Sequence, residues 1–151
     1  MSAKLPLVLI AGSRGYVGSN VFNFLASNGF QVARINRIMS GQFVSDFSIE
    51  VNNHIVDKKS EFLKQEVVFI NTAAVFTRSH SLSDVLPQVS GNIGYPAMIV
   101  DFLSCLSSRV RVINLTSYWK YWFDESNGPR NLYSATQNAF DEILHFFFAE
   151  K

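Results

Sequence analysis

A chain of 151 residues is long enough for one domain with a hydrophobic core and too short for two. Its 48% of apolar and 17% of charged residues are typical of a globular protein, and a net charge of +1 gives no reason to expect nucleic acid as a partner. The single cysteine, Cys105, excludes an intrachain disulfide and fits a reducing cytosol. No apolar run reaches the roughly 18 residues of a membrane span. We therefore expect one cytoplasmic domain over residues 1–151, with no membrane partner.

An apolar run over 7–11 is followed by three glycines and then by apolar residues at helical spacing, as far as a helix stop at 28–29. The run is typical of a strand covered on both faces. Glycines between a strand and a helix let backbone N–H groups approach a pyrophosphate, and the helix dipole favours the anion. We predict a cofactor loop here, with a plain, tightly packed turn as the alternative. Its candidate residues are Gly12, Ser13, Arg14, Gly15, Tyr16, Val17 and Gly18.

A second strand is expected over 31–36, and its last residue bears on the choice of cofactor. A carboxylate there would accept hydrogen bonds from the adenosine ribose and favour NAD, but the sequence has Asn36 followed by Arg37. Arg37, together with Arg14 from the glycine turn, could bond the 2′-phosphate of NADP through planar guanidinium groups. The pattern therefore favours NADP over NAD, unless both arginines are ordinary solvated surface residues.

The weakest pattern covers residues 39–66. A short third strand is expected over 42–44, and Asp46 follows it in a position that suits a turn. Residues 60–65 are typical of the end of a polar helix. His54 has no partner at metal-ligand spacing, so we expect it on the surface and predict no metal site.

A clear strand over 67–70 leads into Asn71, Thr72, Ala73 and Ala74. Small residues at the carboxyl end of a strand let a cofactor lie close to the backbone. Ala73 and Ala74 are therefore candidate cofactor contacts, with simple tight packing as the alternative.

A long helix is expected within 85–106, with Pro96 in its first turn or at a kink. The next strand, 109–115, brings Thr116 and Ser117 to its carboxyl end, where open α/β sheets bind ligands. The regular alternation of strands and helices predicts an α/β fold, a Rossmann-like doubly wound parallel sheet.

The last helix begins near Tyr133. Tyr133 and Gln137 lie four residues apart, so they share one face of this helix.

Three strings resemble the extended branch of the short-chain dehydrogenase/reductase superfamily, which contains nucleotide-sugar epimerases, dehydratases and reductases. They are the G-x-x-G-x-x-G of the loop, the Asn-x-Ala-Ala of 71–74, and a Ser/Thr pair followed by Tyr133. Thr-Ser-Tyr-Trp and Asn-Leu-Tyr-Ser-Ala-Thr are most similar to bacterial CDP-linked dideoxysugar synthases, the abequose-type reductases of O-antigen synthesis. The resemblance covers 5–150. It implies strand order 3-2-1-4-5 and a nucleotide-linked sugar as substrate.

The resemblance also implies catalytic roles. Tyr133 would be the general acid/base, and Ser117, or its neighbour Thr116, would hydrogen-bond the reacting oxygen. A lysine one turn after the tyrosine lowers the tyrosine pKa in the family and binds the nicotinamide ribose. This position holds Gln137, which can bond a ribose but carries no charge. A tyrosine with a pKa near ~10 suits neutral pH poorly without such a cation.

Other positions match family residues near the cofactor. The resemblance makes Asp46 a neighbour of the adenine, and Ala73 and Ala74 neighbours of the ribose. It makes Asn92 a support of the active-site geometry. As bare sequence features, Asp46 is equally a turn residue and Asn92 is a polar group on the side of a helix.

Family members continue for roughly another 130–200 residues, whereas this sequence ends at Lys151. We expect it to lack the last strands and the C-terminal substrate domain. Strand 109–115 would then be an edge, and edges invite pairing. In the family, helices matching 99–106 and 133–148 form the four-helix bundle of a dimer. We therefore expect a homodimer or another form of self-association.

Two classes of function stay open. The first is an NADP-dependent reductase or epimerase/dehydratase of nucleotide-linked sugars, impaired in this chain. The second is a non-catalytic dinucleotide-binding module, or a degenerate fragment of such an enzyme, that acts as an interaction subunit. The glycine loop and Tyr133 favour the first, and Gln137 favours the second. A portion of a longer parent enzyme is a further possibility.

Overall fold

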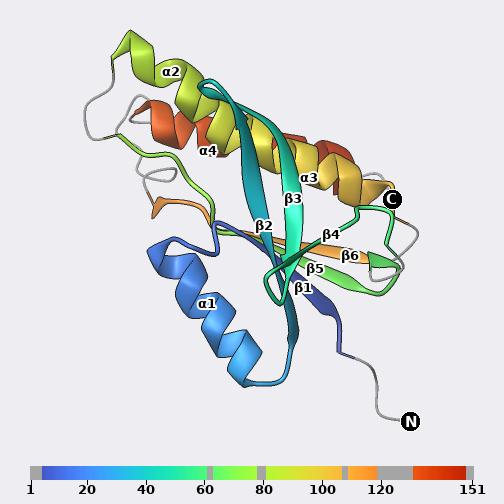
Figure 1. The fold of residues 1–151 in the computed structure, drawn as a ribbon. Coiled ribbons are helices and arrows are strands. Elements are labelled where there is room, and N and C mark those ends of the chain that lie inside the picture. Colours follow the sequence, from blue (N-terminus) through green and yellow to red (C-terminus); the bar gives the residue numbers. More distant parts are fainter. Residues whose placement is uncertain (1–4, 61–62, 78–80, 107–108, 119–130, 149–151) are drawn as a thin grey trace.

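The structure is a computed structural model that describes residues 5–60, 63–77, 81–106, 109–118 and 131–148. Helices and strands alternate along most of this length (Figure 1). The elements are β1 (Leu7–Ala11), α1 (Tyr16–Ser27), β2 (Gln31–Ser40), β3 (Phe43–Val51), β4 (His54–Val56), β5 (Val67–Asn71), α2 (Leu82–Val89), the π-helical turn η2 (Ser90–Gly94), α3 (Tyr95–Ser104), β6 (Val110–Asn114) and α4 (Leu132–Phe148).

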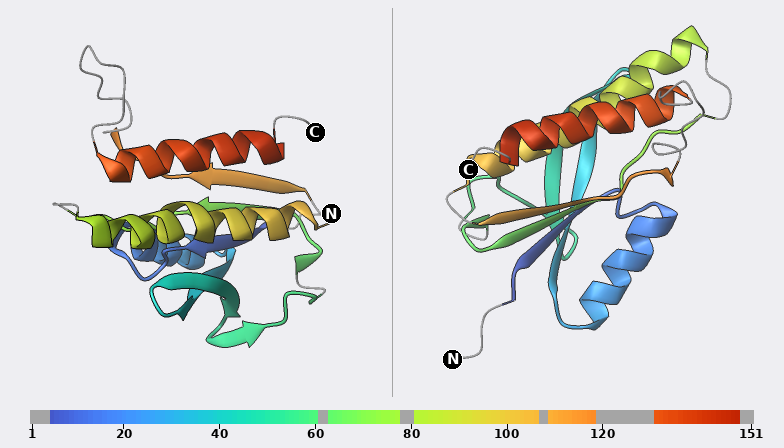
Figure 2. Two further views of the ribbon diagram at one scale, coloured as in Figure 1. Left: turned by 90° about the horizontal axis from the view of Figure 1, so that it is seen from above. Right: turned by 180° about the vertical axis from the view of Figure 1, so that it is seen from behind.

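The strands form one sheet in the order β4-β3-β2-β1-β5-β6. Strands β2, β1, β5 and β6 run parallel, whereas β3 and β4 are antiparallel to their neighbours. Helix α1 covers one face of the sheet, and α3 and α4 lie side by side on the other (Figure 2). This arrangement confirms the Rossmann-like, doubly wound α/β fold, and β6 stands at the edge as the sequence predicts.

Alternation along β1 divides the hydrophobic core between the two faces. Leu7, Leu9 and Ala11 belong to the larger cluster, which includes Ile99 of α3 and Phe140 of α4. The residues between them face the other way and pack against α1 in a smaller cluster. That cluster contains Val8, Ile10, Val32 and Ile70, with Val21, Phe22 and Leu25 of α1 against it. A strand buried on both faces explains the continuous apolar run at the start of the chain.

The region 39–66 differs from the sequence expectation. β2 continues beyond Asn36 to Ser40, and a tight turn with Gly41 at φ +61° returns the chain as β3. The expected short strand over 42–44 is therefore the start of a long antiparallel partner of β2. Phe47 and Ile49, both buried, alternate with polar residues, which is the pattern of a strand covered on one face. The described residues of 60–65 form no α-helix.

The helix expected within 85–106 consists of three consecutive parts. It begins at Leu82, passes through the π-helical turn η2, and continues as α3 with Pro96 in its first turn. Gly91 in η2 lies close to the segment after β5, because a Cβ there would meet Val75 Cγ2 at 2.4 Å. None of the described helices combines the length and hydropathy needed to cross a membrane.

Candidate functional site

A cavity of about 520 Å³ opens at the carboxyl ends of β1, β2 and β5. In open α/β sheets this is the edge at which ligands bind. The site contains three segments that the sequence analysis singled out separately. The lining residues are Gly12, Ser13, Arg14, Gly15, Ile35, Asn36, Arg37, Met39, Thr72, Ala73, Ala74 and Tyr95.

The glycine loop is built with no space for side chains at two positions. Gly12 has a φ of +77°, and a Cβ there would lie 2.6 Å from the backbone nitrogen of Ala73. A Cβ on Gly18 would lie 2.2 Å from the carbonyl oxygen of Gly12 and 2.5 Å from Thr72 Oγ1. The glycines therefore bring β1, α1 and the end of β5 into direct backbone contact.

The same loop leaves polar groups without partners. Ser13 lines the cavity and is 3% exposed, and its Oγ has no hydrogen bond among the described residues. Helix α1 begins after Gly15 without a side-chain cap. Uncapped N–H groups at a helix N-terminus, next to an unpaired hydroxyl, suit an anion such as a pyrophosphate.

Strand β2 supplies Asn36 and Arg37 to the cavity wall. Arg37 forms no ion pair with another described residue. Arg14, in contrast, forms a salt bridge of 3.2 Å with Glu50 of β3. Asn36 Nδ2 donates to the same Glu50 oxygen at 2.9 Å. Sequence reasoning missed Glu50, because it placed no strand there and looked for a carboxylate only at the end of β2.

The end of β5 is tied to its neighbours by hydrogen bonds. Thr72 Oγ1 donates to the carbonyl oxygen of Ala11 at 2.7 Å. Asn71 Nδ2 donates to Asn114 Oδ1 at 2.8 Å, and Asn114 Nδ2 donates to Asp141 Oδ1 at 2.9 Å. These bonds hold the cavity wall, including Ala73 and Ala74, against β1 and β6.

Asn92 lies outside the lining and joins two parts of the site. It is 2% exposed, and its Oδ1 accepts a hydrogen bond from the backbone nitrogen of Val75 at 2.6 Å. Its Nδ2 donates to the carbonyl oxygen of Val75 at 2.9 Å and to Thr136 Oγ1 at 3.0 Å. Asn92 thus fastens the segment after β5 to helix α4.

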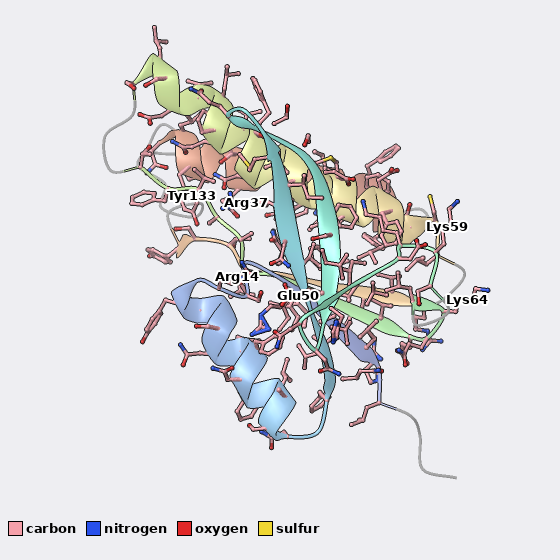
Figure 3. The ribbon with its side chains drawn as sticks, viewed as in Figure 1. Arg14, Arg37, Glu50, Lys59, Lys64 and Tyr133 are labelled. Atoms are coloured by element: carbon pink, nitrogen blue, oxygen red, sulfur yellow. The ribbon has the colours of Figure 1, made fainter. Side chains whose placement is uncertain are left out.

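Tyr133 lies in the first turn of α4, on the same side of the molecule as Arg14 and Arg37 (Figure 3). Its ring packs edge-on against Phe76, with the ring centroids 5.3 Å apart. Partial burial raises the pKa of the Tyr133 hydroxyl above its ordinary value. No described cation counteracts this shift, and Lys59 and Lys64 lie at the other end of the molecule (Figure 3).

Gln137 occupies the lysine position and is 2% exposed, with no side-chain hydrogen bond to a described residue. Thr116 and Ser117 follow β6, whose carboxyl end lies at the same end of the molecule as the start of α4 (Figure 2). Thr116 is exposed and Ser117 is half-buried. Because they follow β6 directly, Thr116 and Ser117 lie at the same end of the molecule as the start of α4, which contains Tyr133 (Figure 2).

Five of the predicted cofactor contacts are not among the lining residues: Gly18 and Asn92, described above, and Tyr16, Val17 and Asp46. Tyr16 is 88% exposed and Val17 is 47% exposed on the outside of α1. The Asp46 carboxylate accepts hydrogen bonds from Lys58 Nζ at 2.5 Å and from the backbone nitrogen of Phe47. The bond from Lys58 is the main cause of a lowered Asp46 pKa. His54 is exposed, as expected, and the described residues contain no group of metal-ligating side chains.

Comparison with solved structures identifies proteins of the same fold. A short-chain dehydrogenase/reductase superfamily protein from Agrobacterium tumefaciens with bound NAD is 19% identical, with a TM-score of 0.65 over 93% of this chain and 44% of that chain. UDP-glucuronic acid 4-epimerase from Bacillus cereus in complex with NAD is 15% identical, with a TM-score of 0.65 over 95% and 52%. dTDP-4-dehydrorhamnose reductase from Bacillus anthracis in complex with NADP is 12% identical, with a TM-score of 0.64 over 97% and 51%.

The chain spans about half the length of these three proteins. Comparison with curated proteins gives no match. The model of the NAD dependent epimerase/dehydratase family, however, matches residues 8–151, from the first strand through the Tyr133 helix. With the glycine loop, the cavity and the sheet order in place, the chain belongs to the NAD dependent epimerase/dehydratase family.

Proposed function

We propose that the cavity binds the pyrophosphate and adenosine of a nicotinamide dinucleotide. The observation that carries this proposal is the glycine loop. Gly12 and Gly18 have no room for a Cβ, and the Ser13 hydroxyl is buried without a hydrogen-bond partner among the described residues. Backbone N–H groups and one hydroxyl at a helix N-terminus form a cradle for phosphate oxygens. The solved relatives named above contain NAD or NADP, which supports the same ligand class.

We further propose that the reaction of the parent fold is a reduction, epimerisation or dehydration of a nucleotide-linked sugar. Tyr133 would transfer the proton, and Ser117 or Thr116 would hydrogen-bond the reacting oxygen. The two relatives with named activities act on sugars linked to UDP and dTDP, according to their names. The sequences Thr-Ser-Tyr-Trp and Asn-Leu-Tyr-Ser-Ala-Thr favour a CDP-linked sugar as the substrate. Such a sugar would be made in the cytoplasm for a surface polysaccharide.

Turnover by this chain is expected to be weak. The bound dinucleotide supplies hydride transfer, but the tyrosine must also exchange a proton near neutral pH. Burial raises the pKa of Tyr133, and Gln137 offers no charge to oppose that effect. A dinucleotide-binding module without catalysis is therefore the second candidate function, and it rests on this pair of residues.

The cofactor choice involves the two arginines at the cavity. Arg37 lines the cavity and is the arginine that could bond the 2′-phosphate of NADP, whereas Arg14 is already paired with Glu50, so the two arginines alone do not fix the choice. Self-association is a separate proposal: α3 and α4 pack side by side, and Phe146 at the end of α4 is 75% exposed. Sedimentation of the purified chain as a monomer at tens of micromolar would contradict it.

The test measures the binding of NADH and of NADPH to the purified chain. The fluorescence of the reduced nicotinamide reports the binding. We expect micromolar binding of at least one nucleotide. Ser13→Ala should weaken it several-fold, because one hydrogen bond to the pyrophosphate is lost. Ser45→Ala, an exposed change in β3, is the matched control and should leave binding unchanged. A folded chain that binds neither nucleotide would refute the proposed function.

A further inference from the structure

A carboxylate stands beside the cavity, on a strand that the sequence analysis did not anticipate. Glu50 belongs to β3, and its side chain is 15% exposed. Glu50 Oε2 accepts hydrogen bonds from Asn36 Nδ2 at 2.9 Å and from Arg14 Nη2 at 3.2 Å. Both donors line the cavity, and Arg14 and Glu50 point toward each other below Arg37 in Figure 3. The carboxylate is therefore held between two residues of the cavity wall.

The antiparallel hairpin explains this placement. Glu50 pairs with Arg34 across the two strands, and Asn36 pairs with Ser48. Cross-strand partners and residues two apart share a face of a sheet, so Glu50 and Asn36 are diagonal neighbours on one face. Asn36 itself comes directly after Ile35, the partner of Ala11 at the end of β1. The hairpin thus brings a carboxylate to Asn36, next to the end of β1, from 14 residues further along the chain.

The geometry leaves this carboxylate with accepting capacity. Both recorded hydrogen bonds go to Oε2, and Oε1 has no hydrogen-bond partner among the described residues. A carboxylate is an acceptor only, and the hydroxyls of a ribose are donors that match it. A 2′-phosphate carries up to two negative charges near pH 7 and would be repelled at the same place. The ion pair with Glu50 also engages Arg14, one of the two cations that could neutralise such a phosphate.

We propose that Glu50 selects the cofactor: its carboxylate accepts a hydrogen bond from the adenosine ribose and makes the cavity prefer NAD over NADP. The proposal rests on the proposed function of the cavity. It reverses the NADP preference that Arg14 and Arg37 indicate in the sequence. The reason is that the missing carboxylate of β2 is supplied by β3.

The test compares the dissociation constants of NADH and NADPH for the 151-residue chain and for Glu50→Gln. We expect the unchanged chain to bind NADH at least tenfold more tightly than NADPH. Glu50→Gln keeps the size of the side chain, removes the charge and releases Arg14 from its ion pair, so it should shift the ratio tenfold or more toward NADPH. Glu66→Gln is the matched control, because Glu66 pairs with Arg111 away from the cavity lining, and it should leave the ratio unchanged.

Two further variants separate the routes by which Glu50 acts. Glu50→Asp keeps the charge but draws it back, so it should weaken NADH binding and still disfavour NADPH. Thermal unfolding of each variant shows whether it is folded. If Glu50→Gln folds poorly, Glu50→Asp still tests the role of Glu50 in cofactor selection. Arg14→Ala should retain the NADH preference if the carboxylate itself contacts the ribose. Loss of the preference in Arg14→Ala would refute direct contact with the ribose.

The outcomes distinguish this inference from the proposed function. Binding of both nucleotides with a ratio that neither Glu50→Gln nor Glu50→Asp changes would overturn the role of Glu50 and leave the dinucleotide site intact. A preference of the unchanged chain for NADPH would overturn it as well. No binding of either nucleotide to the folded chain would overturn both proposals.

Discussion

The glycine loop after β1 and the start of α4 lie on the same side of the molecule, yet they are prepared for different tasks. Around the loop, backbone atoms are so close that Gly12 and Gly18 admit no Cβ, and Ser13 Oγ is buried without a hydrogen-bond partner among the described residues. Around α4, Tyr133 is partly buried against Phe76, and no described cation lowers its pKa. The loop combines close backbone packing with an unpaired buried hydroxyl, whereas burial raises the pKa of Tyr133.

The difference teaches that binding and catalysis depend on separate features of this fold. The proposed phosphate binding depends on the backbone geometry that the packing of β1, α1 and β5 imposes, together with the Ser13 hydroxyl. Proton transfer by a tyrosine near neutral pH needs a nearby charge, and position 137 holds a neutral glutamine. Asn92 connects the two regions through Val75 and Thr136, so it is the residue through which damage at one region would reach the other.

The largest expected effect comes from Gly18→Ala, which disrupts the backbone packing of the glycine loop. The new Cβ would lie 2.2 Å from the carbonyl oxygen of Gly12, and backbone must move to admit it. We expect a loss of about 3 kcal/mol of unfolding free energy and no measurable dinucleotide binding. Urea unfolding and NADH fluorescence measure the two effects. Gly94→Ala is the control, since a Cβ there would be 4.0 Å from the carbonyl oxygen of Val89, with no close contact; equal losses in both variants would contradict the argument.

Asn92→Ala should cut the connection between the two regions. It leaves the backbone nitrogen of Val75 and its carbonyl oxygen without their buried partner, and each unsatisfied group costs about 1–3 kcal/mol. We expect unfolding free energy to fall by about 2–3 kcal/mol, together with weaker dinucleotide binding. Asn20→Ala removes an exposed bond to Tyr16 and should change stability by less than about 0.5 kcal/mol. A similar result for both variants would remove Asn92 from this role.

Gln137→Lys tests whether the Tyr133 region lacks only a charge. A cation on the residue one helical turn after Tyr133 should lower the pKa of Tyr133 by about one unit, equivalent to ~1.4 kcal/mol. Ultraviolet difference titration, with Tyr133→Phe subtracted, measures the shift. Gln137→Met tests for a mere packing effect and should leave the pKa raised. An unchanged titration in Gln137→Lys would show that the side chain does not reach the tyrosine.

The smallest expected effect concerns alkaline stability. Burial raises the pKa of Tyr95, whose hydroxyl donates to the carbonyl oxygen of Ile35 at 2.9 Å. A raised folded-state pKa gives stability that is present below the unfolded pKa of about 10 and is lost as pH rises further. Tyr95→Phe should cost ~1 kcal/mol at neutral pH and make stability less sensitive to pH above about 10. Thermal unfolding across pH measures both; a steeper alkaline loss in the variant would contradict the assignment.

Local pattern was enough for the parts of the molecule that local chemistry controls. The apolar run of β1, the glycines after it, Ala73 and Ala74 after β5, and the start of α4 near Tyr133 all lie where the sequence predicts. Each depends on residues that are neighbours in the chain. Strand length, helix spacing and glycine backbone freedom are properties of such neighbours, so these elements and the conformation of the glycine loop follow from the sequence.

Tertiary structure alone decided how distant residues meet. The turn at Gly41 brings β3 back along β2 and places Glu50 beside Asn36, and no local spacing announces a contact across 14 residues. The surroundings of Gln137, the partial burial of Tyr133 and the hydrogen bond from Asn92 to Thr136 likewise arise only when α4 packs against the rest of the fold. The charge and burial of a site depend on all the residues that surround it in space. Local sequence patterns do not show which distant residues those are.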